Sequence, residues 1–394
     1  MAGLSLHAAG LEVEVFESVA ALRPLGVGIN LLPHAVRELD ELGLRTSLEK
    51  LGVATSELVY FSKHGRRIWG EPRGVAAGYH WPQLSIHRGR LQMFLLDEAR
   101  TRLGAGRIRT GHHLTGWREA GGAIVADFGD VTASGDVLIA ADGIHSAARR
   151  TLYPDEGPPR WSGALLWRGV SEAPPFLSGR SMIMAGHEQQ KFVAYPIGER
   201  RVNWIAELRF DPASGPPRQD WNQRADPADF LPRFETWRFD WLDVPALIRR
   251  AEAIYVYPMV DRDPLPRWSF GRMTLLGDAA HPMVPVGSNG ASQAILDARV
   301  LASCLRASAE PVRALADYEA ARRPATAAIV LANRQQGPEE CMTLVEQRAP
   351  AGFERLSDVI SDAELAAIAD KYKRLAGFAV DELNRRPSLA EGGR

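Results

Sequence analysis

The 394-residue sequence predicts an α/β fold with an antiparallel sheet inserted into a domain of parallel strands. Two short apolar segments each end in a carboxylate, one at Asp142 and the other at Asp278. The second is followed by a loop and a helix that begins at Gly290, which is the strand–loop–helix order of α/β domains. From 161 to 257 the pattern changes to short apolar strands separated by turn residues, which predicts the inserted sheet.

Composition limits the classes of function. Hydrophobic residues make up 45% and charged residues 24% of the chain, as in ordinary globular domains. The formal net charge is -1, which indicates neither nucleic acid nor an anionic membrane as a partner. Cys304 and Cys341 stand alone, so we expect neither a disulfide framework nor a metal site. No leader or membrane-spanning run is visible, and we expect a cytoplasmic protein of unknown oligomeric state.

The first residues depart from the usual dinucleotide-binding pattern, which is a buried strand, Gly-x-Gly-x-x-Gly and a helix. Gly3 is at best the third of these glycines, and the helix that ends near Gly10 is about one turn short. We therefore expect the first strand and the first two glycines to be absent, through a late start codon or a truncated gene. The next strand, 12–17, ends in Glu17, where such sites hold the adenosine ribose; a solvated strand end is the alternative.

The elements expected next are an amphipathic helix at 33–48, a hairpin at 58–69, a helix at 87–103 and strands within 111–141. Arg88, near the start of the third of these, could reach a phosphate, although a surface arginine is the ordinary alternative. The strand that ends at Ala141 leads into Asp142-Gly143.

Strands of the inserted sheet are expected at 165–170, 180–185, 191–197 and 202–208, followed by a polar loop at 211–224. Trp167, Met184 and Tyr195 could line a flat apolar pocket, and plain core is the alternative for each. Helices are then expected from Gly290 towards Leu305, at 317–332 and at 362–375, before a tail at 387–394.

The stretch around Asp278 has the chemistry of a site for a sugar-bearing cofactor. Its carboxylate can accept hydrogen bonds from ribose or ribityl hydroxyls. The helix N-terminus at Asn289-Gly290-Ala291 offers free N–H groups and a partial positive charge to an anion. An ordinary connection between a strand and a helix is the alternative.

Gly-Asp-Ala-Ala-His-Pro at 277–282, with Pro-x-Gly-x-x-Gly-Ala at 285–291, resembles the second FAD fingerprint of the single-component flavoprotein hydroxylases. This is the family of p-hydroxybenzoate and salicylate hydroxylases. The segments 17–29, 85–92 and 137–146 agree with it, apart from Ala140 where glycine is usual. The segments 23–30, 71–74 and 257–266 are similar to the branch that contains the phenazine-hydroxylating enzyme. The resemblance covers almost the whole chain.

This resemblance implies a Rossmann-like FAD-binding domain without its first strand, an antiparallel substrate domain and C-terminal helices. The FAD-binding domain would comprise 1–57, 86–160 and 263–335, the substrate domain 58–85 and 161–262, and the C-terminal segment 336–394. Asp278 would hold the ribityl chain, Pro285 would pack near the flavin, and His281 would serve structure. The residues implied to bind FAD are Glu17, Arg23, Arg88, Gln92, Asp142, Gly143, Asp278, Pro285, Gly287, Asn289, Gly290 and Ala291.

The activity implied is that of an FAD-dependent monooxygenase, which uses NAD(P)H and O2 to hydroxylate an aromatic or heteroaromatic molecule through a flavin hydroperoxide. Two alternatives remain. One is a non-catalytic remnant that binds FAD poorly because its phosphate loop is missing, and the other is a flavin oxidoreductase that does not hydroxylate. The residues identify neither the substrate nor a catalytic side chain, and they do not distinguish NADH from NADPH.

Overall fold

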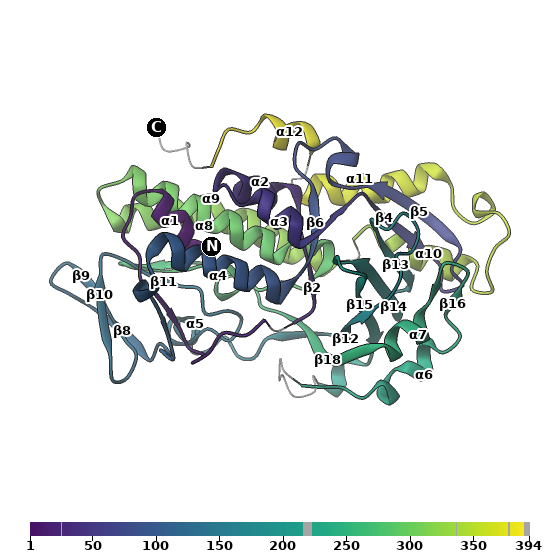
Figure 1. The fold of residues 1–394 in the computed structure, drawn as a ribbon, viewed down its shortest axis with the longest axis horizontal. Helices are drawn as coiled ribbons and strands as arrows, with labels where there is room; N and C mark the ends of the chain where they lie inside the picture. The colour runs from purple at the N-terminus through teal and green to yellow at the C-terminus, as the bar shows by residue number, and fades with distance from the viewer. Residues whose placement is uncertain (25, 216–222, 336, 377–378, 390–394) are drawn as a thin grey trace.

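The structure is a computed structural model that describes residues 1–24, 26–215, 223–335, 337–376 and 379–389, without the side chains of 370–376. Figure 1 shows a helix-rich region that holds the N-terminus beside a second region built on a large sheet. Residues 216–222 of the predicted polar loop and 390–394 of the predicted tail lie outside the described residues.

The helix-rich region contains two small sheets that are not joined to each other. In one, β1 (Val15–Glu17) pairs in parallel with β7 (Ile108–Thr110); in the other, the order is β11 (Leu138–Ala140), β20 (Met273–Leu275) and β19 (Ser269–Phe270). Within the described residues, β1 pairs only with β7, and β11 pairs only with β20. The predicted strand at 12–17 shortens to the three residues that pair with β7.

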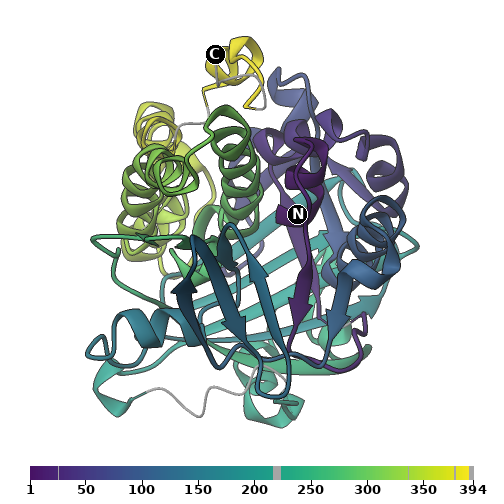
Figure 2. The ribbon, with the colours of Figure 1, turned by 90° about the vertical axis from the view of Figure 1, so that its left-hand side faces the viewer.

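Four helices surround these strands: α1 (Ala2–Ala8), α4 (Arg88–Leu103), α8 (Gly290–Ala307) and α9 (Pro311–Asn333). The short α1 packs against both α4 and α8, as Figure 2 shows near the N-terminus. It buries Leu4 and Leu6 there. The helix predicted from Gly290 is confirmed, and the helix predicted at 317–332 begins earlier, at Pro311, a favoured residue for a first helical turn.

A third small sheet has the order β2 (Gly28–Leu31), β6 (Gln83–His87) and β3 (Gly52–Thr55). The single helix predicted at 33–48 is instead two helices, α2 (Pro33–Glu41) and α3 (Arg45–Leu51). Gly43 lies between them with φ of +74°, a left-handed conformation that ends a helix. The predicted boundary between the substrate domain and the FAD-binding domain, after residue 85, falls within β6.

The second region is a seven-stranded sheet in the order β18-β12-β15-β14-β13-β4-β5. All its strand pairs are antiparallel except β13 with β4. The predicted hairpin at 58–69 is confirmed as β4 and β5. The strands are β4 (Glu57–Phe61), β5 (Arg67–Pro72), β12 (Arg160–Glu172), β13 (Ser181–His187), β14 (Gln190–Pro196), β15 (Arg201–Arg209) and β18 (Ala251–Asp261).

Both faces of this sheet are covered. One packs on α6 (Leu231–Phe234), α7 (Val244–Arg249) and the hairpin of β16 (Arg238–Phe239) and β17 (Leu242–Asp243). The other packs on α10 (Glu340–Arg348), α11 (Asp362–Ala376) and the loop before α8. Strands buried on both faces carry apolar residues at consecutive positions, so alternation does not reveal which face a residue occupies.

The remaining elements lie outside these layers. They are the antiparallel sheet of β8 (Gly116–Ala120), β9 (Ala123–Asp127) and β10 (Thr132–Gly135), the helix α5 (Ala147–Leu152) and the helix α12 (Val380–Arg385). Arg37 of α2 ties α12 to the molecule by donating to the carbonyl of Leu383 at 3.0 Å. None of the helices that the structure describes is both long and apolar enough to span a membrane.

Candidate functional site

The loop between β20 and α8 brings a carboxylate to a helix N-terminus. Gly277, with φ of +62°, turns the chain after β20 and places Asp278 in the short 3₁₀ turn at Gly277–Ala279. A Cβ atom on Gly290, the first residue of α8, would lie 4.0 Å from Asp278 Oδ1. The carboxylate and the N–H groups of the helix therefore face one site, which suits a ligand with both hydroxyl and anionic groups.

Asp278 lies near the charged groups of His281, Arg88 and Asp297. Burial raises the pKa of its carboxyl, and the charges of His281 and Arg88 act against that shift. The side chain nevertheless remains exposed to solvent. A carboxylate that is surrounded by protein and still accessible can bind a ligand without first breaking an ion pair.

A buried network holds this loop against α8. Asp297 of α8 accepts from Arg322 Nε at 2.7 Å and from the backbone N–H of Gly277 at 3.3 Å, and its Oδ2 lies 2.5 Å from His281 Nε2. Burial alone would raise the pKa of Asp297, but His281 and Arg322 outweigh it and lower that pKa. His281 therefore has a structural role, as the sequence indicated.

Two neighbouring arginines have no carboxylate partner among the described residues. Arg88 begins α4, and Arg168 lies on β12, where its Nη2 donates to the carbonyl of Gly28 at 2.8 Å. Within the described residues, neither guanidinium has a carboxylate within 4.0 Å, and Arg168 Nε is buried without a hydrogen-bond partner. Burial lowers the pKa of Arg168, and the charge of Arg88 adds to that effect. Two cations that have no ion-pair partner among the described residues suit an anionic ligand.

Sequence reasoning named Arg88 but missed Arg168. The available signal was a single cation inside the apolar run 165–170. Arg88 also lies close to the glycine-rich turn before β2, since a Cβ on Gly26 would be 3.5 Å from the Arg88 side chain.

The other predicted cofactor residues occupy three places. Pro285, Gly287, Asn289 and Ala291 lie on the loop and first turn beside Asp278, and Gln92 is exposed on α4, one turn beyond Arg88. Arg23 is exposed, and Gly143 takes φ of +79°. Glu17 and Asp142 bind backbone N–H groups: Glu17 accepts from Val19 at 3.0 Å, and Asp142 accepts from Ala147, at the start of α5, at 2.8 Å. Their cofactor roles stay predictions.

The prediction that Trp167 shares a pocket with Met184 and Tyr195 is wrong. Trp167 pairs with Ala206, and its ring stacks on Phe230 at 5.0 Å between centroids, on the face covered by α6 and α7. Tyr195 and Met184 lie on the opposite face, because successive residues of a strand alternate between faces.

Tyr195 also packs differently from the prediction. A Cβ on Gly28 would lie 2.8 Å from its ring and 2.6 Å from Asn203, so β2 rests directly on the sheet there. Only glycine permits this approach. Tyr195 therefore supports β2, and Met184 lines a small cavity instead.

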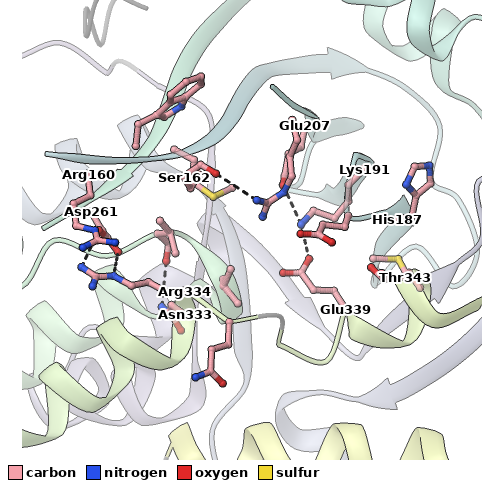
Figure 3. Close-up of a pocket in the computed structure, with 18 residues that line it drawn as sticks. Arg160, Ser162, His187, Lys191, Glu207, Asp261, Asn333, Arg334, Glu339 and Thr343 are labelled. Atoms are coloured by element: carbon pink, nitrogen blue, oxygen red, sulfur yellow. Dashed lines mark hydrogen bonds and ion pairs between the residues drawn. The ribbon is translucent and has the colours of Figure 1, made fainter. Parts of the chain in front are cut away.

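Two cavities lie between the sheet, the loop before α8 and the start of α10. The larger, the Glu207 cavity (Figure 3), has a volume of about 250 Å³ and is lined by residues that include Trp161, Lys191, Glu207, Arg209, Met259 and Val286. The smaller, the Met184 pocket, has a volume of about 60 Å³ and is lined by residues that include Tyr60, Met184 and Gly287. Val286 and Glu339 line both, so the cavities adjoin each other.

A buried ion cluster lines the Glu207 cavity, and one of its members, Glu339, also lines the Met184 pocket. Lys191 Nζ lies 3.0 Å from Glu207 Oε2 and 2.5 Å from Glu339 Oε2, and Glu339 is 148 residues away in sequence. Burial would lower the pKa of Lys191, but the two carboxylates outweigh it and raise that pKa. Lys191 therefore stays charged. The sequence carries no local signal for this cluster.

Comparison with known proteins identifies the family. Residues 1–333 match the family described as FAD binding domain. Phenazine 1,6-dicarboxylic acid hydroxylase PhzS of Lysobacter antibioticus is 45% identical over 389 residues, which cover 94% of this chain and 93% of that protein. The chain belongs to the family of FAD-dependent aromatic hydroxylases. The narrower resemblance to the phenazine-hydroxylating branch is thereby confirmed.

Other relatives agree. The 3-amino-4-hydroxybenzoate 2-monooxygenase PtnB3 of Streptomyces platensis is 32% identical over 90% of both chains. Among solved structures, a salicylate hydroxylase in complex with its substrate superposes with a TM-score of 0.75 at 23% identity, covering 99% of this chain and 94% of that one, which shows the shared fold. The predicted fold of an FAD-binding domain with an antiparallel substrate sheet and C-terminal helices is therefore confirmed.

The protein is an FAD-dependent monooxygenase, and NAD(P)H is the reductant typical of its family. The described residues fit the cofactor. An accessible carboxylate at Asp278 suits sugar-like hydroxyls, and the guanidiniums of Arg88 and Arg168, which have no carboxylate partner among the described residues, suit the negative charge of a dinucleotide.

Proposed function

We propose that this chain hydroxylates a planar heteroaromatic acid, consuming NAD(P)H and O2 and releasing NAD(P)⁺ and water. One oxygen atom enters the ring and the other leaves as water, with NAD(P)H supplying the two electrons. The names of three relatives support an acid-bearing ring, since they specify phenazine dicarboxylic acid, aminohydroxybenzoate and hydroxybenzoate.

One observation carries this proposal. The loop that carries Asp278 continues through Val284 and Val286 into the wall of the Glu207 cavity. A ring in that cavity would therefore lie beside the loop on which we place the flavin, at Pro285. The apolar side chains of Met259, Val284 and Val286 give such a ring flat contacts.

The chain's own residues prepare this site. Asp278 would accept from the ribityl hydroxyls, Arg88 and Arg168 would neutralise phosphate charge, and the N-terminus of α8 would stabilise negative charge on the reduced ring. FAD, when bound, supplies electron transfer from NAD(P)H and the activation of O2. The His281–Asp297–Arg322 network fixes the loop on which we place the flavin.

The test is to load the protein with FAD and to measure NAD(P)H and O2 consumption with phenazine carboxylic acids, hydroxybenzoates and aliphatic ketones. We expect stimulation by the aromatic acids and a product heavier by one oxygen atom. Stimulation by aliphatic ketones alone would contradict the proposal. NAD(P)H oxidation without oxygenated product would indicate a flavin oxidoreductase that does not hydroxylate.

A further inference from the structure

The Glu207 cavity carries more charge than an apolar ring requires. Most of these charges are already neutralised by close partners, some of them visible in Figure 3. The ion pairs are Lys191–Glu207, Lys191–Glu339, Arg334–Asp261 and Arg160–Asp263.

Two polar atoms in this cavity lack a hydrogen-bond partner among the described residues. Glu207 Oε1 and Arg209 Nε are both buried and have no hydrogen-bond partner within the part of the chain that the structure describes. Arg209 also has no carboxylate within 4.0 Å among those residues, and its Nη1 makes only a long hydrogen bond to the carbonyl of Ser162, at 3.4 Å. Buried polar atoms are nearly always paired, so these two atoms indicate a group that is supplied by a ligand.

The two residues stand together on β15. They are two positions apart and therefore point to the same face of the sheet, towards the cavity. Glu207 is 3% exposed, so its position is fixed by packing rather than by solvent. An acceptor and a donor held side by side in this way match the edge of one polar substituent.

Building on the proposed function, we propose that Glu207 and Arg209 are a specificity-determining pair that binds the acid substituent of the aromatic substrate. An acid oxygen would accept from Arg209 Nε, and a proton shared between the acid and Glu207 would satisfy Oε1. The ring would lie against Trp161, Met259 and Val286, which line the same cavity.

The position of Arg209 favours an acid over an amine. Lys191 already lies beside two carboxylates, whereas Arg209 has no carboxylate within 4.0 Å among the described residues, so an acid of the ligand can pair with it. Burial raises the pKa of Glu207, and the neighbouring charge of Glu339 acts in the same direction, which eases the sharing of a proton with the substrate acid.

The test compares phenazine-1-carboxylate with unsubstituted phenazine as ligands of the FAD-loaded protein. Binding is measured by calorimetry and by quenching of intrinsic fluorescence, to which Trp161 contributes from the cavity wall. We expect the wild type to bind the acid roughly 10- to 100-fold more tightly than the unsubstituted ring. Arg209→Met should abolish most of this preference, Glu207→Gln should reduce it, and Arg209→Lys, which keeps the charge but changes the geometry, should retain part of it.

Matched controls are Arg160→Met and Glu188→Gln, which alter charges on the wall of the same cavity. Both should leave the preference within about threefold of the wild type. The pair assignment is overturned if the wild type shows no preference for the acid, if Arg209→Met weakens both ligands equally, or if the controls have the same effect as the pair. Melting temperature and bound flavin verify that each variant is folded.

Hydroxylation by the wild type is measured separately. In one outcome, rings that lack an acid group are hydroxylated and bind as tightly as the aromatic acid does. The proposed hydroxylase function then stands and the pair assignment fails. If no ring is hydroxylated while the acid binds through Arg209, the proposed function fails and the pair remains a binding site.

Discussion

Replacing Asp297 by Asn tests whether the buried network positions the cofactor loop. The substitution keeps the shape of the side chain but removes the negative charge that faces His281 and Arg322. Asp297 is fully buried, and Arg322 is 8% exposed, so water cannot replace the lost charge. Breaking a buried ion pair costs about 3–5 kcal/mol, and the hydrogen bonds that Asn can still make put the expected loss near 3 kcal/mol.

The assay is thermal unfolding together with FAD titration. In a chain of this size each kcal/mol lowers the melting temperature by at most about 2 °C, so we expect a fall of about 5 °C. FAD affinity should fall as well, because the backbone N–H of Gly277, next to Asp278, is bonded to Asp297. The control is Asp317→Asn, which removes an exposed carboxylate 3.9 Å from Arg313 and should change stability by less than about 0.5 kcal/mol.

The pH dependence of stability provides a second test of the Asp297→Asn substitution. Since the pKa of Asp297 is lowered in the folded protein, its stabilising effect is present above the unfolded pKa of about 3.9 and is lost as the pH falls through the lower folded value. The difference between wild type and Asp297→Asn should therefore be constant above about pH 5 and shrink below about pH 4. A variant that melts within 1 °C of the wild type at about pH 7, where the full effect is expected, would refute the role assigned to the network.

Asp278→Ala should weaken FAD binding by about 1.5–3 kcal/mol in a folded protein, because a charged acceptor for the ribityl hydroxyls is lost. An unchanged affinity in a flavin titration would contradict the role of Asp278 in binding FAD. Arg168→Met should weaken FAD binding in a salt-dependent way because a cation is lost, and it should change the melting temperature little, since relief of the repulsion from Arg88 offsets the lost hydrogen bond to Gly28; an affinity equal to wild type at low salt would contradict this. Trp167→Phe should lower the melting temperature and leave aromatic ligand affinity unchanged, because Trp167 lies on the face away from the cavities, and altered ligand binding would place it in the site after all. A version with an apolar strand and a Gly-x-Gly turn added before α1 should bind FAD more tightly and melt higher, because β1 and β11 each have one strand partner among the described residues; equal flavin content and melting temperature in the two forms would count against it.

Local sequence determined the cofactor half of this protein. The glycine at 277, the carboxylate at 278 and the helix start at 290 lie within fourteen residues. Residues so close in sequence also lie close together in the fold, so the sequence alone predicts that they act at one site. The helices from 88 and 290 and the hairpin of β4 and β5 were predictable for the same reason. Gly43, by contrast, lies inside the single helix that the apolar pattern at 33–48 predicts, although its left-handed φ divides that segment into two helices.

Only the tertiary structure decided the substrate side. Trp167 and Tyr195 belong to equally apolar strands, and a sheet that is buried on both faces leaves no polar alternation to show which way each side chain points. The Lys191–Glu339 pair joins residues 148 apart, so no local pattern could place them together. The unpaired atoms of Glu207 and Arg209 are likewise a property of packing, because whether a polar atom finds a partner depends on every segment that folds around it.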